Sequence, residues 1–229
     1  IGLGKVVGNT HVTINGGTIK KEVYGGGNKG QVDGNTYVYL NNDSSVPTVY
    51  GGCNQADVLG SSNVFVNTNA NTINYVYGGN NITGKVKEVN ITVSSGIVAN
   101  LYGGGDLAHD DYTTNITVEN GSIDNLYGGG RLASVGNINM KLESPTITNV
   151  YGGGDQGNTF GNILIKLTNN PTIDNLFGGA NQADVYGNVN INIDNATVTH
   201  LYGGNNLSGS INGNVNITTT LTTPQDPLQ

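Results

Sequence analysis

Three charged residues stand at equivalent positions in successive segments of this sequence. Asp106, Arg131 and Asp155 each follow a run of three glycines, and they are 25 and 24 residues apart. If the segments stack, two carboxylates and a guanidinium become neighbours, and such a set is a candidate catalytic site. Asp106 and the nearby residues 109–111 (His-Asp-Asp) could also bind Ca²⁺, which prefers oxygen ligands. The alternative is a structural column in which these alternating charges replace the Asn residues of other repeats and pair with one another, while residues 109–111 form a solvated corner.

A column of aromatic residues accompanies these charges. Each aromatic residue follows Val or Leu and precedes two glycines, and the column consists of Tyr24, Tyr50, Tyr77, Tyr102, Tyr127, Tyr151, Phe177 and Tyr202. Its steps are 24 to 27 residues long. A period this steady predicts one supersecondary unit stacked on itself, because no single copy can bury its own apolar face.

In each copy of the repeat, the aliphatic residue and the aromatic residue after it should point to opposite sides of the strand. We expect the aliphatic residue to point inward and the aromatic rings to form an exposed stack, because buried hydroxyls would each need a partner. An exposed stack could bind sugar rings or a second solenoid. The alternative is a ladder that only stabilises neighbouring coils, and the absence of Trp weakens the sugar-binding version.

Each repeat contains the elements that would position these columns. The first is a strand with apolar and polar residues in alternation, as in residues 187–193. The second, as in residues 172–177, breaks the alternation at Asn175, which predicts a left-handed or bulged Asn there. A short third strand, such as residues 183–186, leads to the next repeat, and no segment has the spacing of an amphipathic helix.

Composition excludes several classes of function. Charged residues are 11% of the chain, with 16 Asp plus Glu against 9 Lys plus Arg, so the clustered cations of a nucleic-acid-binding protein are missing. No apolar run approaches the length of a membrane span. His11, His109 and His200 share no column, so no metal triad is expected, and no cofactor motif is present. The single cysteine, Cys53, is expected to be a packed residue in a small slot.

Coils of about 25 residues with three strand segments, V/I-x-I alternation and Asn at the bends resemble the parallel β-helix of bacterial surface adhesins, autotransporter passengers and pectate-lyase-like proteins. The resemblance implies an all-β solenoid of eight to nine coils over residues 1–218, right-handed as parallel crossovers usually are. Residues 219–229 form a Thr/Pro-rich tail or linker. In pectin-degrading members, carboxylates and a basic residue lie on adjacent coils, so Asp106, Arg131 and Asp155 are the catalytic alternative. The chain lacks the long loops that wall a cleft in such enzymes.

These observations favour a non-catalytic rod, a segment of a larger secreted or cell-surface bacterial protein. Its Tyr and Asn columns would present a long face to a surface glycan or a host protein, and the rod ends or the Tyr face could self-associate. A polysaccharide-active lyase, hydrolase or epimerase is the second hypothesis, and a self-assembling extracellular filament is the third.

Overall fold

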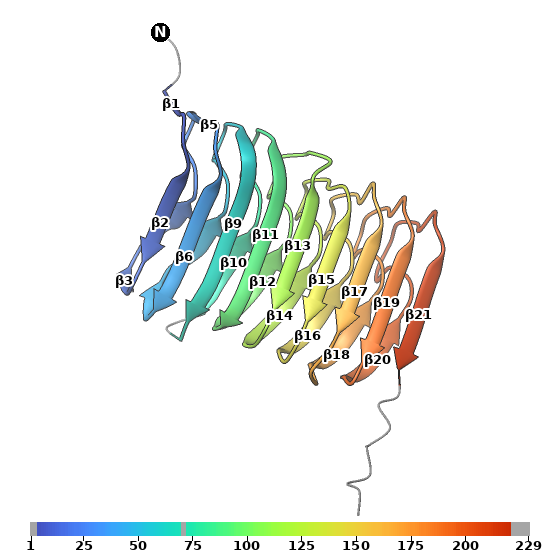
Figure 1. The fold of residues 1–229 in the computed structure, drawn as a ribbon. Helices are drawn as coiled ribbons and strands as arrows, with labels where there is room; N and C mark the ends of the chain where they lie inside the picture. Colours follow the sequence, from blue (N-terminus) through green and yellow to red (C-terminus); the bar gives the residue numbers. More distant parts are fainter. Residues whose placement is uncertain (1–3, 70–71, 221–229) are drawn as a thin grey trace, which may run out of the picture.

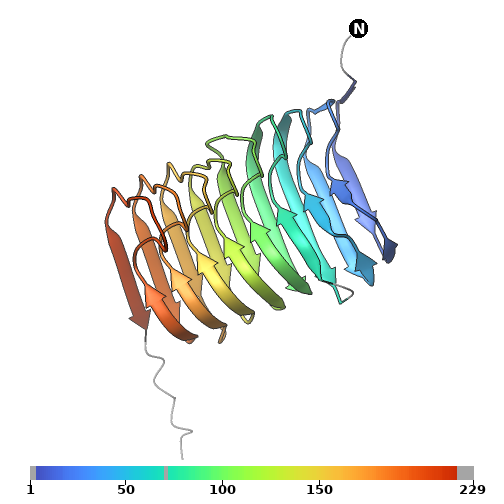
Figure 2. The same ribbon diagram turned by 180° about the vertical axis from the view of Figure 1, so that it is seen from behind.

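The chain winds into a parallel β-solenoid. The computed structural model describes residues 4–69 and 72–220, and in this part the chain forms 21 strands and no helix. The strands stack in about eight turns of about 26 residues each, so the solenoid expected from the repeat period is confirmed. Figure 1 shows the strands of successive turns side by side in sequence order, and Figure 2 shows the opposite sheet from behind.

The larger sheet contains the alternating strands. Its members within the described residues are β1 (Lys5–Val6), β2 (Thr10–Ile14), β5 (Gln31–Val32), β6 (Thr36–Asn42), β9 (Val58–Thr68), β11 (Val86–Ser95), β13 (Thr113–Val118), β15 (Ile138–Leu142), β17 (Ile163–Leu167), β19 (Val189–Asp194) and β21 (Val215–Thr220). Each strand pairs in parallel with its counterpart one turn away, for example Ile191 with Ile217. The register places equivalent repeat positions directly above one another.

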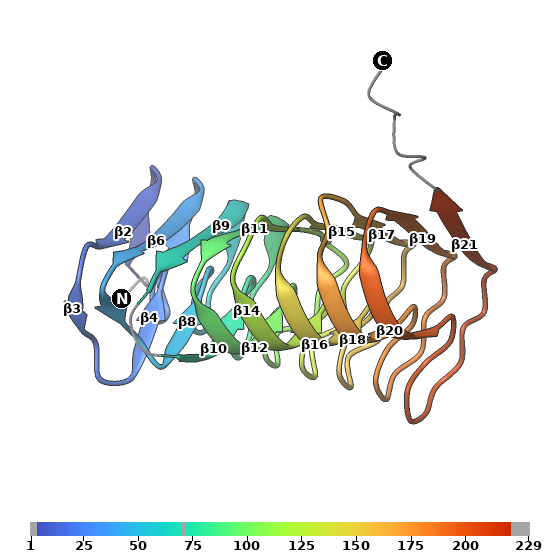
Figure 3. The same ribbon diagram turned by 90° about the horizontal axis from the view of Figure 1, so that it is seen from below.

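The second sheet carries the aromatic column. It consists, in the described part of the chain, of β4 (Glu22–Tyr24), β8 (Thr48–Tyr50), β10 (Ile73–Tyr77), β12 (Ile97–Tyr102), β14 (Ser122–Tyr127), β16 (Thr146–Tyr151), β18 (Thr172–Phe177) and β20 (Thr197–Tyr202). Strands β3 (Gly17–Thr18) and β7 (Ser44–Ser45) form a small additional pair. The two large sheets lie on opposite sides of a flattened coil (Figure 3).

A continuous aliphatic core lies between the sheets. The inward positions of β15 and β17, such as Met140, Leu142 and Ile165, are buried, as the alternation predicts. Ile173 and Leu176 are both buried although they are three residues apart, so both point inward as expected. Branched side chains at the same level of every coil therefore pack against their counterparts one turn away.

Two details of the coil differ from expectation. The Asn of the second strand does not take the left-handed conformation, which was one of the two forms expected for it. In the described residues the positive φ angles of non-glycine residues occur at the end of β6 (Asn42) and in the turns after β17 and β19 (Asn169, Asn170 and Asn195). From β10 to β20 the pairing of neighbouring second strands skips one residue, as at Asp124, and this interruption turns both Ile123 and Leu126 inward.

The expected third strand is reduced in most coils to isolated bridges, such as Thr159 to Val185. At the C-terminal side, β21 extends to Thr220, two residues beyond the boundary expected from sequence. The remainder of the Thr/Pro-rich tail lies outside the described residues.

Candidate functional site

The aromatic column is an uninterrupted ladder of stacked rings. Neighbouring rings from Tyr24 to Tyr202 are separated by 4.6–5.2 Å between centroids and are inclined by 8° or less. The spacing equals the distance between strands of one sheet, so the parallel register alone sets it. We call this set the tyrosine ladder.

The tyrosine ladder is buried, which corrects the expectation of an exposed stack. Its five central members, Tyr50 to Tyr151, are only 4–7% exposed, whereas Tyr202 at the last turn is 45% exposed. The direction of the side chains is as predicted, because the rings form a cluster separate from the aliphatic core. The rings nevertheless lose contact with solvent, since each face is covered by the ring of the next coil. The ladder offers little accessible ring surface for a ligand except at its ends.

The hydroxyl groups of the ladder lie at its outer edge, beside the column that follows the glycines. Asn81 donates a hydrogen bond to the Tyr24 hydroxyl at 3.0 Å, and this hydroxyl donates to Glu22 at 2.9 Å. No ladder hydroxyl is among the described buried polar atoms without a partner. The sequence prediction assumed that buried rings would leave their hydroxyl groups without hydrogen-bond partners, and the structure does not show such unpaired hydroxyls in the described part of the ladder.

Burial changes the acidity of the ladder. Desolvation raises the pKa of Tyr24 to about 12, with a further contribution from the hydrogen bond to Glu22. Desolvation also raises the pKa of Tyr50, Tyr77, Tyr102 and Tyr127, and the nearby carboxylates of Asp106 or Asp155 add to it. The phenols are therefore held neutral, and the ladder contributes no nucleophile or base near neutral pH.

Two amide ladders flank the rings. On one side Asn149 donates to Asn125 at 2.9 Å and Asn175 donates to Asn149 at 3.0 Å. In the column after the glycines, Asn81 donates to Asn54 at 2.9 Å and Asn206 donates to Asn181 at 2.9 Å. Each of these four bonds joins two asparagines one coil apart, so these parts of the columns link the coils along the axis.

The three charged residues of the catalytic hypothesis occupy consecutive levels of the amide column, as their spacing predicts. Arg131 forms an ion pair with Asp106, and this contact raises the pKa of the arginine. Asp155 accepts a hydrogen bond from Asn181 at 2.6 Å. Both carboxylates are therefore engaged by neighbouring side chains, in the manner of the structural column considered as the alternative.

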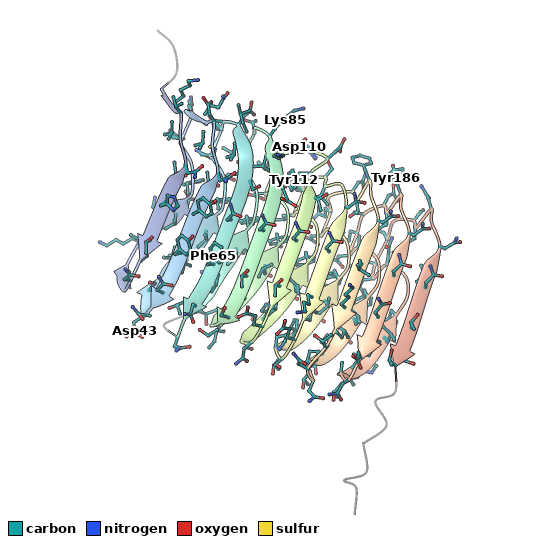
Figure 4. The ribbon with its side chains drawn as sticks, in the orientation of Figure 1. Asp43, Phe65, Lys85, Asp110, Tyr112 and Tyr186 are labelled. Carbon is teal, nitrogen blue, oxygen red and sulfur yellow. The ribbon has the colours of Figure 1, made fainter. Side chains whose placement is uncertain are left out.

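Residues 109–111, which the sequence suggested together with Asp106 as calcium ligands, bond to backbone groups. His109 accepts a hydrogen bond from the Ser134 backbone at 3.0 Å through Nδ1, and Asp110 accepts bonds from the backbones of Val86 and Asp111. No group of three or more His, Cys, Asp or Glu side chains within residues 4–69 and 72–220 could hold a metal ion. The segment thus caps backbone groups of neighbouring coils, and Asp110 is visible at this corner in Figure 4.

Two asparagines, the buried Asn80 and the half-buried Asn205, had no role assigned from sequence. Asn80 replaces the third glycine of its coil, accepts a hydrogen bond from Cys53 N–H at 2.7 Å and donates to the carbonyls of Ala56 and Lys85 at 3.1 and 3.3 Å. Asn205 does the same with Ala180, Ala183 and Ser208. The shared signal is Asn-Asn-x-Thr/Ser-Gly, whose glycines Gly84 and Gly209 have positive φ. These asparagines fasten one corner to the preceding coil.

Cys53 is a packed residue, as predicted. Its side chain is fully buried, its thiol faces the carbonyls of Gly30 and Asp57, and desolvation raises its pKa. A buried thiol held protonated is a poor nucleophile.

The glycines allow the coils to approach closely. A Cβ at Gly103 would collide with the carbonyl oxygen of Gly128, whereas one at Gly204, on the last turn, would meet nothing. A side chain is therefore excluded at Gly103, where the next coil packs against the backbone, and the same holds for Gly104, the counterpart of Gly204, whose Cβ would lie 2.7 Å from the Gly130 nitrogen.

Comparison with protein-family models, with curated proteins and with solved structures finds no match to this chain. No helix in residues 4–69 and 72–220 has the length and apolar character needed to cross a membrane. The fold class is therefore defined by the stacked strands themselves, as a parallel β-solenoid.

Proposed function

We propose that the chain is a non-catalytic structural and adhesive rod, a segment of a larger bacterial protein that is secreted or held at the cell surface. The observation that carries this proposal is the continuity of the columns. The tyrosine ladder and the aliphatic core run from coil to coil, and amide ladders add to them over several coils, so a bend would break several sets of contacts together. A stiff element of this kind serves to hold a binding surface away from its point of attachment.

The pairing of the charged residues favours a non-catalytic rod and not a polysaccharide-active enzyme. A catalytic acid or base must reach the substrate, but Asp106 is paired with Arg131 and Asp155 is bonded to Asn181. The outer face of the larger sheet carries amides such as Asn139, Asn190 and Asn192, which suit shallow polar contacts with a glycan or a protein surface.

The test is incubation of the chain with neutral and acidic polysaccharides, with and without Ca²⁺, followed by measurement of retention and of polymer length. Retention with unchanged polymer length is the expected result. Shortened or epimerised polymer would refute the proposal and direct attention to Asp106, Arg131 and Asp155. If none of the polysaccharides is retained, the proposed adhesion to glycans is refuted.

A further inference from the structure

An exposed aromatic pair lies at the corner where strands β17 and β19 begin. Phe160 and Tyr186 are 48% and 45% exposed, and their ring centroids are 5.3 Å apart. Figure 4 shows Tyr186 projecting outward from this corner. Backbone hydrogen bonds from Phe160 to Val135 and from Tyr186 to Thr159, both 2.9 Å, fix the positions of the two residues. Neither ring contributes to the core or to the tyrosine ladder.

A shallow hollow of about 600 Å³ lies on the outer face of the larger sheet, two residues along the chain from each ring. One row of its lining consists of Asn137, Asn162 and Asn188. The Oδ1 atom of each accepts a hydrogen bond of 2.8 Å from the backbone of the next coil. Their orientation is therefore fixed, and the Nδ2 donors have no acceptor among the described residues.

The second row of the hollow contains a break in an amide ladder. Asn139 donates to Asn115 at 2.9 Å and Asn216 donates to Asn190 at 3.1 Å, but Leu164 stands between Asn139 and Asn190 in the register. Leu164 cannot continue the ladder. Within the described part of the chain, Oδ1 of Asn139 and Nδ2 of Asn190 are therefore left without protein partners, on either side of a half-buried apolar side chain.

We propose that this hollow, with Phe160 and Tyr186 at its edge, is a binding site for an uncharged oligosaccharide. A sugar presents C–H groups on its faces and hydroxyls around its rim, which match apolar side chains and free amides respectively. No charged side chain lines the hollow, so a ligand carboxylate would find no counterion within it. The inference rests on the adhesive part of the proposed function and assigns it a location and a ligand class.

An adjoining hollow contains lysines, so neutral and acidic saccharides should bind to different parts of this face. It lies beyond Asn139 and Leu164 and includes Lys141 and Lys166, of which Lys141 forms an ion pair with Glu143 at 2.6 Å. An acidic saccharide would be drawn toward Lys166. Neutral and acidic probes therefore report on two different parts of this face.

The test is calorimetric titration of the whole chain with neutral hexasaccharides of glucose, xylose and mannose, and with a hexasaccharide of galacturonic acid. Three variants accompany it. The double variant Phe160→Ser/Tyr186→Ser removes the rings, and Leu164→Asn completes the amide ladder with the residue usual at that position. Leu59→Ser is the matched control, because exposed Leu59 precedes Gly60 as Phe160 precedes Gly161 but lies several coils away.

We expect a neutral hexasaccharide to bind, and we expect the double variant to reduce its affinity about tenfold or more, because the rings that cover the sugar faces are lost. Leu164→Asn should also weaken binding, and Leu59→Ser should leave it unchanged. Side-chain amide shifts of Asn162 and Asn188 in NMR spectra should move with ligand in the parent chain.

Neutral binding that survives both site variants would overturn this site while leaving an adhesive rod intact. Binding of the galacturonate probe alone would refute the uncharged ligand class. If none of the probes binds at millimolar concentration, the site is refuted, and the polymer-retention experiment then decides whether the adhesive function survives elsewhere on the rod.

Discussion

Substitution of Asn80 by Ala tests how the corners of the solenoid are held. Asn80 is 1% exposed, and its amide makes three hydrogen bonds to backbone groups of the chain. At about 1 kcal/mol for each bond, their loss should cost about 3 kcal/mol. Repeat proteins open locally between neighbouring units, so the cost should appear first as opening of the corner that contains Cys53.

The assay uses Cys53, the single thiol of the chain, as a reporter. Its side chain is buried and its backbone N–H donates to Asn80, so it reacts with a thiol reagent only when the corner opens. Because 1.4 kcal/mol corresponds to a factor of ten, a loss of about 3 kcal/mol should accelerate labelling about a hundredfold in the Asn80→Ala variant.

Asn205→Ala is the matched control. Asn205 makes the equivalent three bonds, but on the last complete turn and far along the axis from Cys53. Its replacement should leave the labelling rate of Cys53 unchanged and accelerate amide hydrogen exchange only at Ala180. A labelling rate for Asn80→Ala within threefold of the parent chain, or equal acceleration by both variants, would refute the idea that these asparagines fasten individual corners.

Three further predictions concern the ladder and the glycines. Tyr102→Ala should lower the free energy of unfolding by about 3 kcal/mol in urea titrations, whereas Tyr102→Phe should change it little, because Phe177 already occupies one level of the ladder; equal losses would show that the hydroxyl carries the stability. Gly103→Ala should prevent folding or reduce stability severely, as monitored by circular dichroism, whereas Gly204→Ala, which meets no neighbour, should be tolerated; similar behaviour of both variants would contradict the close approach of coils. Alkaline titration should destabilise the fold. An unfolded tyrosine ionises near pH 10, and burial raises the pKa of Tyr24 to about 12 and that of the central ladder as well, so the unfolded state releases protons first. The ladder's contribution to stability is thus complete below about pH 10 and is lost as pH rises toward and beyond 12. Tyrosinate absorbance from the ladder should appear together with loss of β-sheet circular dichroism, and full ionisation with an unchanged β-sheet signal would be inconsistent with burial.

The buried tyrosine ladder changes where a ligand should be sought. The stacked rings stabilise the rod, and the outer face of β15, β17 and β19 provides the accessible amides. Leu164 is informative because it differs from its column. Leu164 removes two amide hydrogen bonds from the ladder, and it lies beside exposed aromatic rings. This level of the rod therefore differs from the others.

The sequence by itself determined the architecture. The steps between Tyr24 and Tyr202 set the length of a coil, and the alternation of residues such as Ile191 and Asn192 set which side of each strand is buried. Both signals are local: each depends on the two-residue period of a strand and on a repeat that brings like residues into register. Stacking of the rings followed from these two properties alone.

Exposure, pairing and turn conformation were decided by the tertiary structure. Whether Tyr102 is exposed depends on how closely the rings above and below approach, and whether Asp106 is free depends on the residue one coil away, which is Arg131. The left-handed residues fell at Asn42 and Asn195, not at the bend expected from sequence, because the interrupted pairing of the second strand turned the chain without a positive φ. These properties depend on distances across the stack, and a linear pattern contains no measure of those distances.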